Sequence, residues 1–148
     1  MTDHDVALAA LADAVAALFD VFATSRFEPG FAARCSPLGE RRVLASRLER
    51  EPLAELDTEM LAVYCFKSLS TMGNEADFKH FLPRMLELFA TDERWQHHDT
   101  QLWPKLAQLN WQAWPAPERA ALERYVARLR ECVAAGALPH LADEELPA

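Results

Sequence analysis

Glycine is scarce in this sequence, with four among 148 residues, whereas apolar residues make up 51% of the chain. Glycine loses more conformational freedom in a helix than any other residue, while the abundant alanine and leucine lose little. This balance favours an all-α fold. A chain of this length buries about 70% of its unfolded surface, so it needs neither a metal nor a disulfide for stability. We therefore predict a single helical domain over residues 1–148.

Long apolar runs are also missing, because no stretch approaches the roughly 20 residues that a membrane-spanning helix requires. The sequence starts MTDHD, which is acidic where a signal peptide would be basic. The three cysteines, Cys35, Cys65 and Cys132, include no closely spaced pair, which is typical of a reducing compartment. We therefore expect a cytoplasmic protein that does not contact a membrane.

Positive charge is in deficit, with 15 lysine and arginine residues against 23 aspartate and glutamate residues and a formal net charge of −8. Such a protein would repel the phosphate backbone of a nucleic acid, so nucleic-acid binding is not expected. A basic protein, by contrast, would be attracted, and its encounter with this chain would be accelerated.

The motifs of common enzymes and metal sites are missing. The sequence contains no HExxH, CxxC, GxSxG, P-loop or GxGxxG pattern. Adjacent His97 and His98 point to different sides of the chain, so only one of them could join a site with Asp99. Cys35 lies beside Arg34 but has no histidine nearby in the sequence, as a catalytic thiol would need. We therefore expect no metal, no cofactor and no catalytic residue, and we favour a protein that is not an enzyme.

Apolar residues at intervals of three and four predict six or seven helices joined by short connections. Successive helix pairs of about 35 to 45 residues suggest stacked antiparallel hairpins, either a small solenoid like HEAT or armadillo repeats or an irregular bundle. The acidic end of the chain, residues 139–148, is expected to be flexible. The helices are expected over residues 4–24, 36–50, 58–72, 75–81, 83 to about 89, about 102–109 and 116–136.

The helix predicted over residues 58–72 is expected to be central. Asp57 or Thr58 can accept hydrogen bonds from its first turn as the N-cap residue. Val63 and Phe66 widen its apolar stripe, so we predict that this helix is buried on more than one side. Its inner face is expected to hold Leu61, Tyr64, Cys65, Leu69 and Met72.

The stretch TMGNEADFKHFLPRMLELFA follows that helix. Asn74, directly after Gly73, can cap a new helix, and Asp77 lies at the position that completes a capping box. Pro83 cannot lie inside a helix without losing a hydrogen bond. We therefore predict two short helices that meet at this proline, with one helix kinked there as the alternative. The first is expected over residues 75–81 and the second from Pro83 to about Phe89.

The segment YCFKSLSTMGNEADFKHFLPR resembles a motif of a group of small, uncharacterised bacterial proteins, YxFKxxxTxGxxxDFxHFLPR. The later segment WQAWPAPERAAL is similar to a second segment of that group, while Met72 stands where the motif would have tryptophan. The resemblance implies kinship and a helical fold, and it implies no reaction. The matching residues are Tyr64, Phe66, Lys67, Thr71, Gly73, Asp77, Phe78, His80, Phe81, Leu82, Pro83 and Arg84.

Residues 51–93 are strongly acidic, with nine acids against three bases and a local balance of −6. Several acids fall at helix starts, where the helix dipole favours them, so dipole compensation and solubility are one explanation. If the helices stack as hairpins, the same acids would gather along one edge and form an acidic face. The acids are Glu51, Glu55, Asp57, Glu59, Glu75, Asp77, Glu87, Asp92 and Glu93, and the bases are Lys67, Lys79 and Arg84.

We therefore predict a non-catalytic protein-interaction module that binds a basic partner through an acidic surface with aromatic anchors. An immunity-type inhibitor, whose carboxylates occlude the basic active site of a toxin or effector, is its concrete form. Partner contacts are predicted at Glu55, Glu59, Glu75, Asp77, His80, Glu87, Trp95 and Trp111.

Two other functions stay open. The first is an enzyme or small-molecule binder, because Asp77 and His80 share one helix face at i, i+3 and could form an acid–base pair. The second is a structural role in a larger assembly, which a broad exposed apolar patch would indicate. In the first case a cleft between helices would hold Tyr64, Lys67, Asp77, His80 and Arg84.

Overall fold

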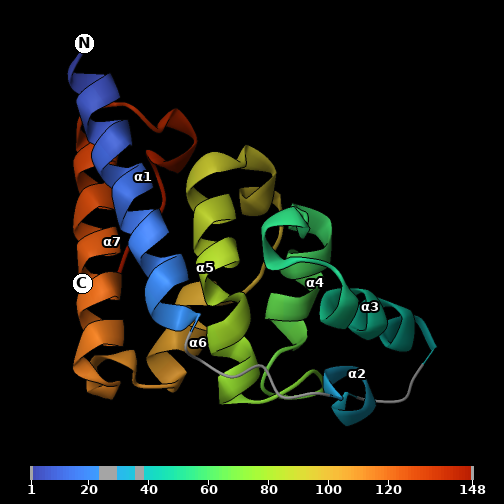
Figure 1. The fold of residues 1–148 in the computed structure, drawn as a ribbon. Helices are drawn as coiled ribbons and strands as arrows, with labels where there is room; N and C mark the ends of the chain where they lie inside the picture. The colour runs from blue at the N-terminus through green and yellow to red at the C-terminus, as the bar shows by residue number, and fades with distance from the viewer. Residues whose placement is uncertain (1, 24–29, 36–38, 148) are drawn as a thin grey trace. The chain divides into compact units, whose positions relative to one another are not determined.

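A computed structural model describes residues 2–23, 30–35 and 39–147. These residues form seven α-helices and four short 3-10 helices and no strand, so the all-α prediction is confirmed (Figure 1). None of these helices is long and apolar enough to cross a membrane. The contacts group the chain into two compact units, Met1–Phe22 with Trp103–Ala148, and Ala23–Leu102. The solenoid arrangement and the single domain stay predictions.

The first unit is built on two long helices, α1 (Asp3–Phe22) and α7 (Ala116–Ala134), which lie side by side in Figure 1. Each buries one apolar stripe, as the three- and four-residue spacing predicts. The Cys132 thiol of α7 donates a hydrogen bond to the Ala7 carbonyl of α1, with 3.2 Å between sulfur and oxygen. The buried stripes are Leu11, Ala14, Val15, Leu18 and Phe22 on α1, and Ala121, Leu122, Tyr125, Val126, Leu129 and Cys132 on α7.

Short helices complete this unit. Trp114 is buried and lies edge-on to Phe22, with ring centroids 6.0 Å apart. The side chain of Leu141 is fully buried, so the segment predicted to be flexible from residue 139 is packed as far as this leucine. These helices are α6 (Leu102–Gln108), η3 (Trp111–Ala113) and η4 (Pro139–Leu141).

The second unit centres on a hairpin of α4 (Thr58–Lys67) and α5 (Glu75–Thr91). Its helices are antiparallel, because the Thr58 hydroxyl at the start of α4 donates a hydrogen bond to Asp92, which follows the end of α5. The helix start predicted at Ser36 lies outside the described residues. The other helices are α2 (Phe31–Arg34), α3 (Gly39–Arg50), η1 (Leu53–Glu55) and η2 (Glu93–His97).

The α4 helix is shorter than predicted and is not buried on several sides. It ends at Lys67, because Ser68 takes an extended backbone conformation and its hydroxyl donates to the Cys65 carbonyl at 2.7 Å. Val63 is 40% exposed and Phe66 is 53% exposed, so these two residues do not extend the buried stripe. They instead leave α4 with an apolar face in solvent.

The α5 helix is a single helix with Pro83 inside it, so the two-helix prediction is wrong and the one-helix alternative holds. A proline inside a helix removes one hydrogen bond and costs about 3 kcal/mol. Each large apolar side chain that α5 buries contributes about 1.5–3 kcal/mol, so several of them outweigh the proline. The buried apolar side chains are Phe78, Phe81, Leu82, Pro83, Met85, Leu86, Leu88, Phe89 and Ala90.

Candidate functional site

One end of the α4–α5 hairpin gathers six carboxylates, and we call it the acidic end. At this end the start of α4 lies beside the end of α5, because Thr58 Oγ1 donates a hydrogen bond to Asp92 Oδ2 at 2.5 Å. The Arg84 guanidinium of α5 donates to the Leu56 carbonyl at 2.8 Å, which brings η1 to the same place. The carboxylates are Glu55, Asp57, Glu59, Glu87, Asp92 and Glu93.

The acidic end is negative, since its six carboxylates face two arginines and leave a formal charge of −4. Arg84 pairs with Glu87 at 2.6 Å, and Arg94 pairs with Asp92 at 2.8 Å. Hydrogen bonds from Arg94, and then from Thr58, hold the pKa of the Asp92 carboxyl well below its usual range. The remaining side chains, Glu55, Asp57, Glu59 and Glu93, are exposed to solvent.

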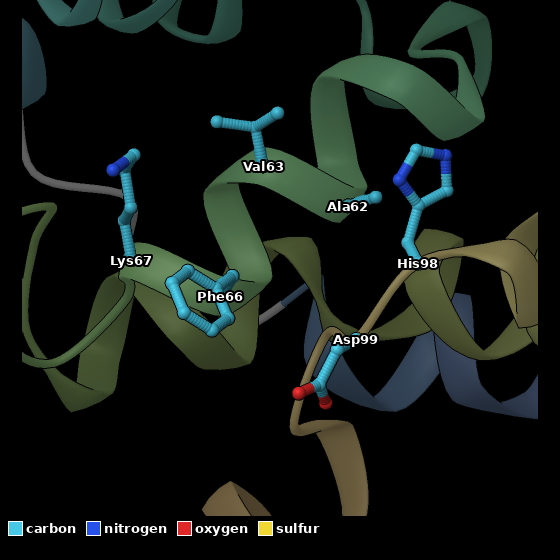
Figure 2. A pocket seen from close by; sticks show the side chains of 6 residues that line it. All are labelled: Ala62, Val63, Phe66, Lys67, His98 and Asp99. Carbon is cyan, nitrogen blue, oxygen red and sulfur yellow. The ribbon is translucent and has the colours of Figure 1, made fainter.

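A small hollow lies on the exposed face of α4 (Figure 2). Its volume is about 220 Å³. Figure 2 shows Val63, Phe66 and Lys67 standing on α4, and the other wall comes from the segment that follows η2. Glu59, Val63 and Phe66 occupy positions i, i+4 and i+7 of one helix face, so Glu59 of the acidic end lies on the same face of α4 as the hollow. The lining residues are Ala62, Val63, Phe66, Lys67, His98 and Asp99.

The opposite end of the hairpin holds a carboxylate that is fully buried. Asp77 Oδ2 accepts from Arg34 Nη1 at 2.6 Å and from the Asn74 amide at 2.8 Å. Asp77 Oδ1 accepts from Arg34 Nη2 at 2.9 Å, which makes the ion pair bidentate. The Asn74 side chain in turn accepts from the Asp77 amide at 3.1 Å, so the predicted capping box is present. Asp77 therefore fastens α2 to the start of α5.

Aromatic rings surround this buried carboxylate. The Phe81 ring lies 4.6 Å from the Tyr64 ring and 5.5 Å from the Phe31 ring, between centroids. Among the described residues the buried Tyr64 hydroxyl has no hydrogen-bond partner, and burial, with the negative charge of Asp77, raises its pKa. His80 lies edge-on to Phe81 at 4.8 Å, and burial lowers its pKa while Asp77 partly opposes this shift. Tyr64, Asp77 and Phe81 at this end of the hairpin therefore belong to the core.

Only three of the five side chains of the predicted catalytic cleft lie near one another, because Tyr64 and His80 both contact Phe81 beside the buried Asp77. Tyr64 and Asp77 are fully buried in the aromatic core, whereas Lys67 lines the hollow on the exposed face of α4. Arg84 lies at the acidic end, where it contacts Leu56 and Glu87. The structure therefore offers no common cleft to these residues.

The carboxylates of the predicted acidic edge separate into two groups. Glu55, Glu59 and Glu87 lie at the acidic end, whereas Glu75 and Asp77 lie at the opposite end of the hairpin. The reason is that α4 and α5 are antiparallel, so the starts of the two helices point in opposite directions. Only the acids at the end of α5 join those at the start of α4.

The predicted aromatic anchors are in the core. Trp95 is 2% exposed and Trp111 is 6% exposed, so neither side chain can reach a partner in this structure. The exposed apolar residues of the second unit that adjoin carboxylates are Val63 and Phe66, which sequence reasoning assigned to the core. The sequence did contain one indication of their exposure, because both residues lie outside the main apolar stripe of α4.

Among the described residues, no group of three or more histidine, cysteine, aspartate or glutamate side chains could hold a metal ion. The chain matches no protein-family model, no curated protein and no solved structure. The acidic end and the hollow on α4 together form the candidate binding surface.

Proposed function

We propose that this protein is a non-catalytic interaction module that binds a basic protein partner through the acidic end of the α4–α5 hairpin. The observation that supports the proposal is the gathering of six carboxylates from four elements beside the exposed Val63 and Phe66. An immunity-type inhibitor of a basic toxin, acting in the bacterial cytoplasm, is the concrete form that we favour.

The two parts of this surface have different physical roles. A formal charge of −4 at one end attracts a basic partner over about 8–10 Å at physiological salt, and this attraction raises the association rate. Exposed charge pairs add little free energy each, because water and salt screen them. Apolar side chains that become buried on binding supply more of the affinity. The acidic end therefore raises the rate of association, and the exposed apolar face of α4 lowers the rate of dissociation.

The proposal is tested with random peptides displayed on phage and selected against the immobilised full chain. We expect the selected peptides to be rich in lysine and arginine. The double variant Glu55→Lys, Glu59→Lys should bind them about ten-fold more weakly or worse, and its binding should depend less on salt. The matched control is Asp13→Lys, an exposed charge reversal on α1, which should change the affinity little.

Selection of neutral or acidic peptides would overturn the proposal. So would equal affinity of basic peptides for the double variant and the wild type at low salt. Circular dichroism of each variant checks that the helical content is unchanged, so that a loss of affinity reports on the surface.

A further inference from the structure

We infer that the segment of the partner that binds here is an amphipathic helix, and that the hollow beside Phe66 holds one of its large apolar side chains. A basic residue of that helix, two turns away, pairs with Glu59. This inference rests on the proposed function and specifies the partner of the same surface.

The size and walls of the hollow select a single apolar side chain. Pockets for small molecules usually measure about 300–1,000 Å³, and this hollow of about 220 Å³ is smaller. Ala62, Val63 and Phe66 make most of its α4 wall apolar, and Lys67, His98 and Asp99 form a polar edge. An apolar pocket with a polar rim is the arrangement in which an anchor residue of a protein partner contributes most to affinity.

The spacing along α4 indicates a helical partner. Glu59 and Phe66 are seven residues apart, which is about 10 Å along a helix axis. A partner helix lying along α4 places residues i and i+7 on one face at the same distance, so one can reach the carboxylate while the other enters the hollow. Helices pack on helices by fitting such rows of side chains into grooves.

The charges along α4 orient the partner. Glu59 is at the end of the face that adjoins the other carboxylates, and Lys67 is at the opposite end, about 12 Å away along the axis. A basic residue is therefore favoured over Glu59, and an uncharged or acidic residue is favoured over Lys67. A second copy of this chain fits less well, because it would bring its own acidic end, of charge −4, close to this one.

The experiment uses the peptides selected on the full chain, chosen long enough to form several helical turns. We expect a large apolar residue and a lysine or arginine seven positions apart, and a rise in peptide helicity on binding, measured by circular dichroism. Moving the basic residue by two positions turns it about 200° around the helix and should weaken binding about ten-fold.

Variants of this protein test whether the hollow beside Phe66 contributes more to binding than other exposed apolar side chains do. Phe66→Ala should weaken binding about ten-fold or more, and Val63→Ala should weaken it to a smaller extent. The matched control is Val43→Ala on α3, because Val43 is 65% exposed and lies away from the hollow, so its affinity should be unchanged. All three positions are exposed, so the variants are expected to fold.

The failure of this inference differs from the failure of the proposed function. Basic peptides that bind in extended form, or that bind Phe66→Ala and the wild type equally, would overturn the helical anchor, while the effect of Glu55→Lys, Glu59→Lys would still support the proposed function. Self-association that Phe66→Ala abolishes, measured by sedimentation, would overturn it in favour of a second copy. Loss of any preference for basic peptides would overturn both.

Discussion

The two ends of the α4–α5 hairpin use the same kind of residue for opposite purposes. At one end, Asp77 is fully buried, forms a bidentate ion pair with Arg34 and completes the capping box of Asn74. At the other end, Glu55 and Glu59 are in solvent. A carboxylate at a helix start is therefore no guide to function by itself, since its surroundings decide whether it is buried in an ion pair or exposed to solvent.

The difference follows from what is packed beside each end. Around Asp77 the rings of Phe31, Tyr64 and Phe81 exclude water, so the charge is stable there only while Arg34 stays bonded to it. Around the acidic end water reaches most of the carboxylates, so no partner is required for folding. The first end should therefore respond to substitution with lost stability, and the second with lost binding.

The largest effect should come from Asp77→Ala. This change breaks the buried pair and removes the capping bonds, so we expect the free energy of unfolding to fall by about 4 kcal/mol. Urea denaturation followed by circular dichroism measures it. The matched control is Glu75→Ala, an exposed acid in the same helical turn, which should lose less than about 1 kcal/mol. Equal losses would contradict the distinction between the two ends.

The next largest effect should come from Gly73→Ala, which tests how tightly the buried end is packed. Gly73 has φ +82°, and a Cβ atom there would lie 2.6 Å from Asp77 Oδ2 and 2.9 Å from Phe31 Cε1. Backbone strain together with this clash should lower the free energy of unfolding by about 3 kcal/mol.

Gly30→Ala is the matched control for that clash. Its φ of +85° is nearly the same, but a Cβ atom at this position would meet no atom of the described residues within 4 Å. Only the strain remains, so a loss of about 1 kcal/mol is expected in the same urea titration. If the two alanine variants were equally stable, the close packing of Gly73 against Asp77 would be refuted.

A smaller effect is expected from Asp92→Asn at the acidic end. The pKa of Asp92 is held below its usual range in the folded protein, so the unfolded chain binds its proton first as the pH falls. Wild-type stability should therefore decline from about pH 4 downwards, and the asparagine variant should decline less. At neutral pH the variant should lose about 1 kcal/mol, because its bonds with Arg94 are weakened. Thermal unfolding at several pH values distinguishes the two proteins.

The smallest effect is expected from His80→Gln. Burial lowers the pKa of His80 in the folded protein, so the unfolded chain binds the proton first as the pH falls through about 6.5, and the free energy of unfolding of the wild type then decreases. The glutamine variant should lose this part of the pH dependence, which melting temperatures across the range would show. An unchanged profile would mean that His80 titrates as freely in the folded state as in the unfolded chain.

Local patterns predicted much of the fold, as individual elements show. The apolar spacing predicted α1 and α7, and Asn74 with Asp77 predicted the start of α5, because these signals depend on residues within one or two turns. The prediction that the helix breaks at Pro83 was wrong. The lost hydrogen bond is a local cost that the sequence shows, whereas the burial of apolar side chains that outweighs it depends on the rest of the second unit.

The candidate site was predicted only in part. Glu55, Glu59 and Glu87 were expected to share one edge with Glu75 and Asp77, but the antiparallel helices place Glu75 and Asp77 at the other end of the hairpin. The expected anchors Trp95 and Trp111 are buried. A large apolar residue carries the same signal whether it is buried or exposed, so the sequence could not show that the tryptophans are in the core while Phe66 is exposed.

The amino-acid sequence by itself determined that this chain is helical, acidic and capped at Asn74, because propensity, charge and capping depend on neighbouring residues. Only the tertiary structure decided that Arg34 neutralises Asp77 across 43 positions of the chain and that Phe66 stays in solvent. The reason is physical: burial and ion pairing depend on which distant segments pack together, and the pattern of one helix does not contain that information.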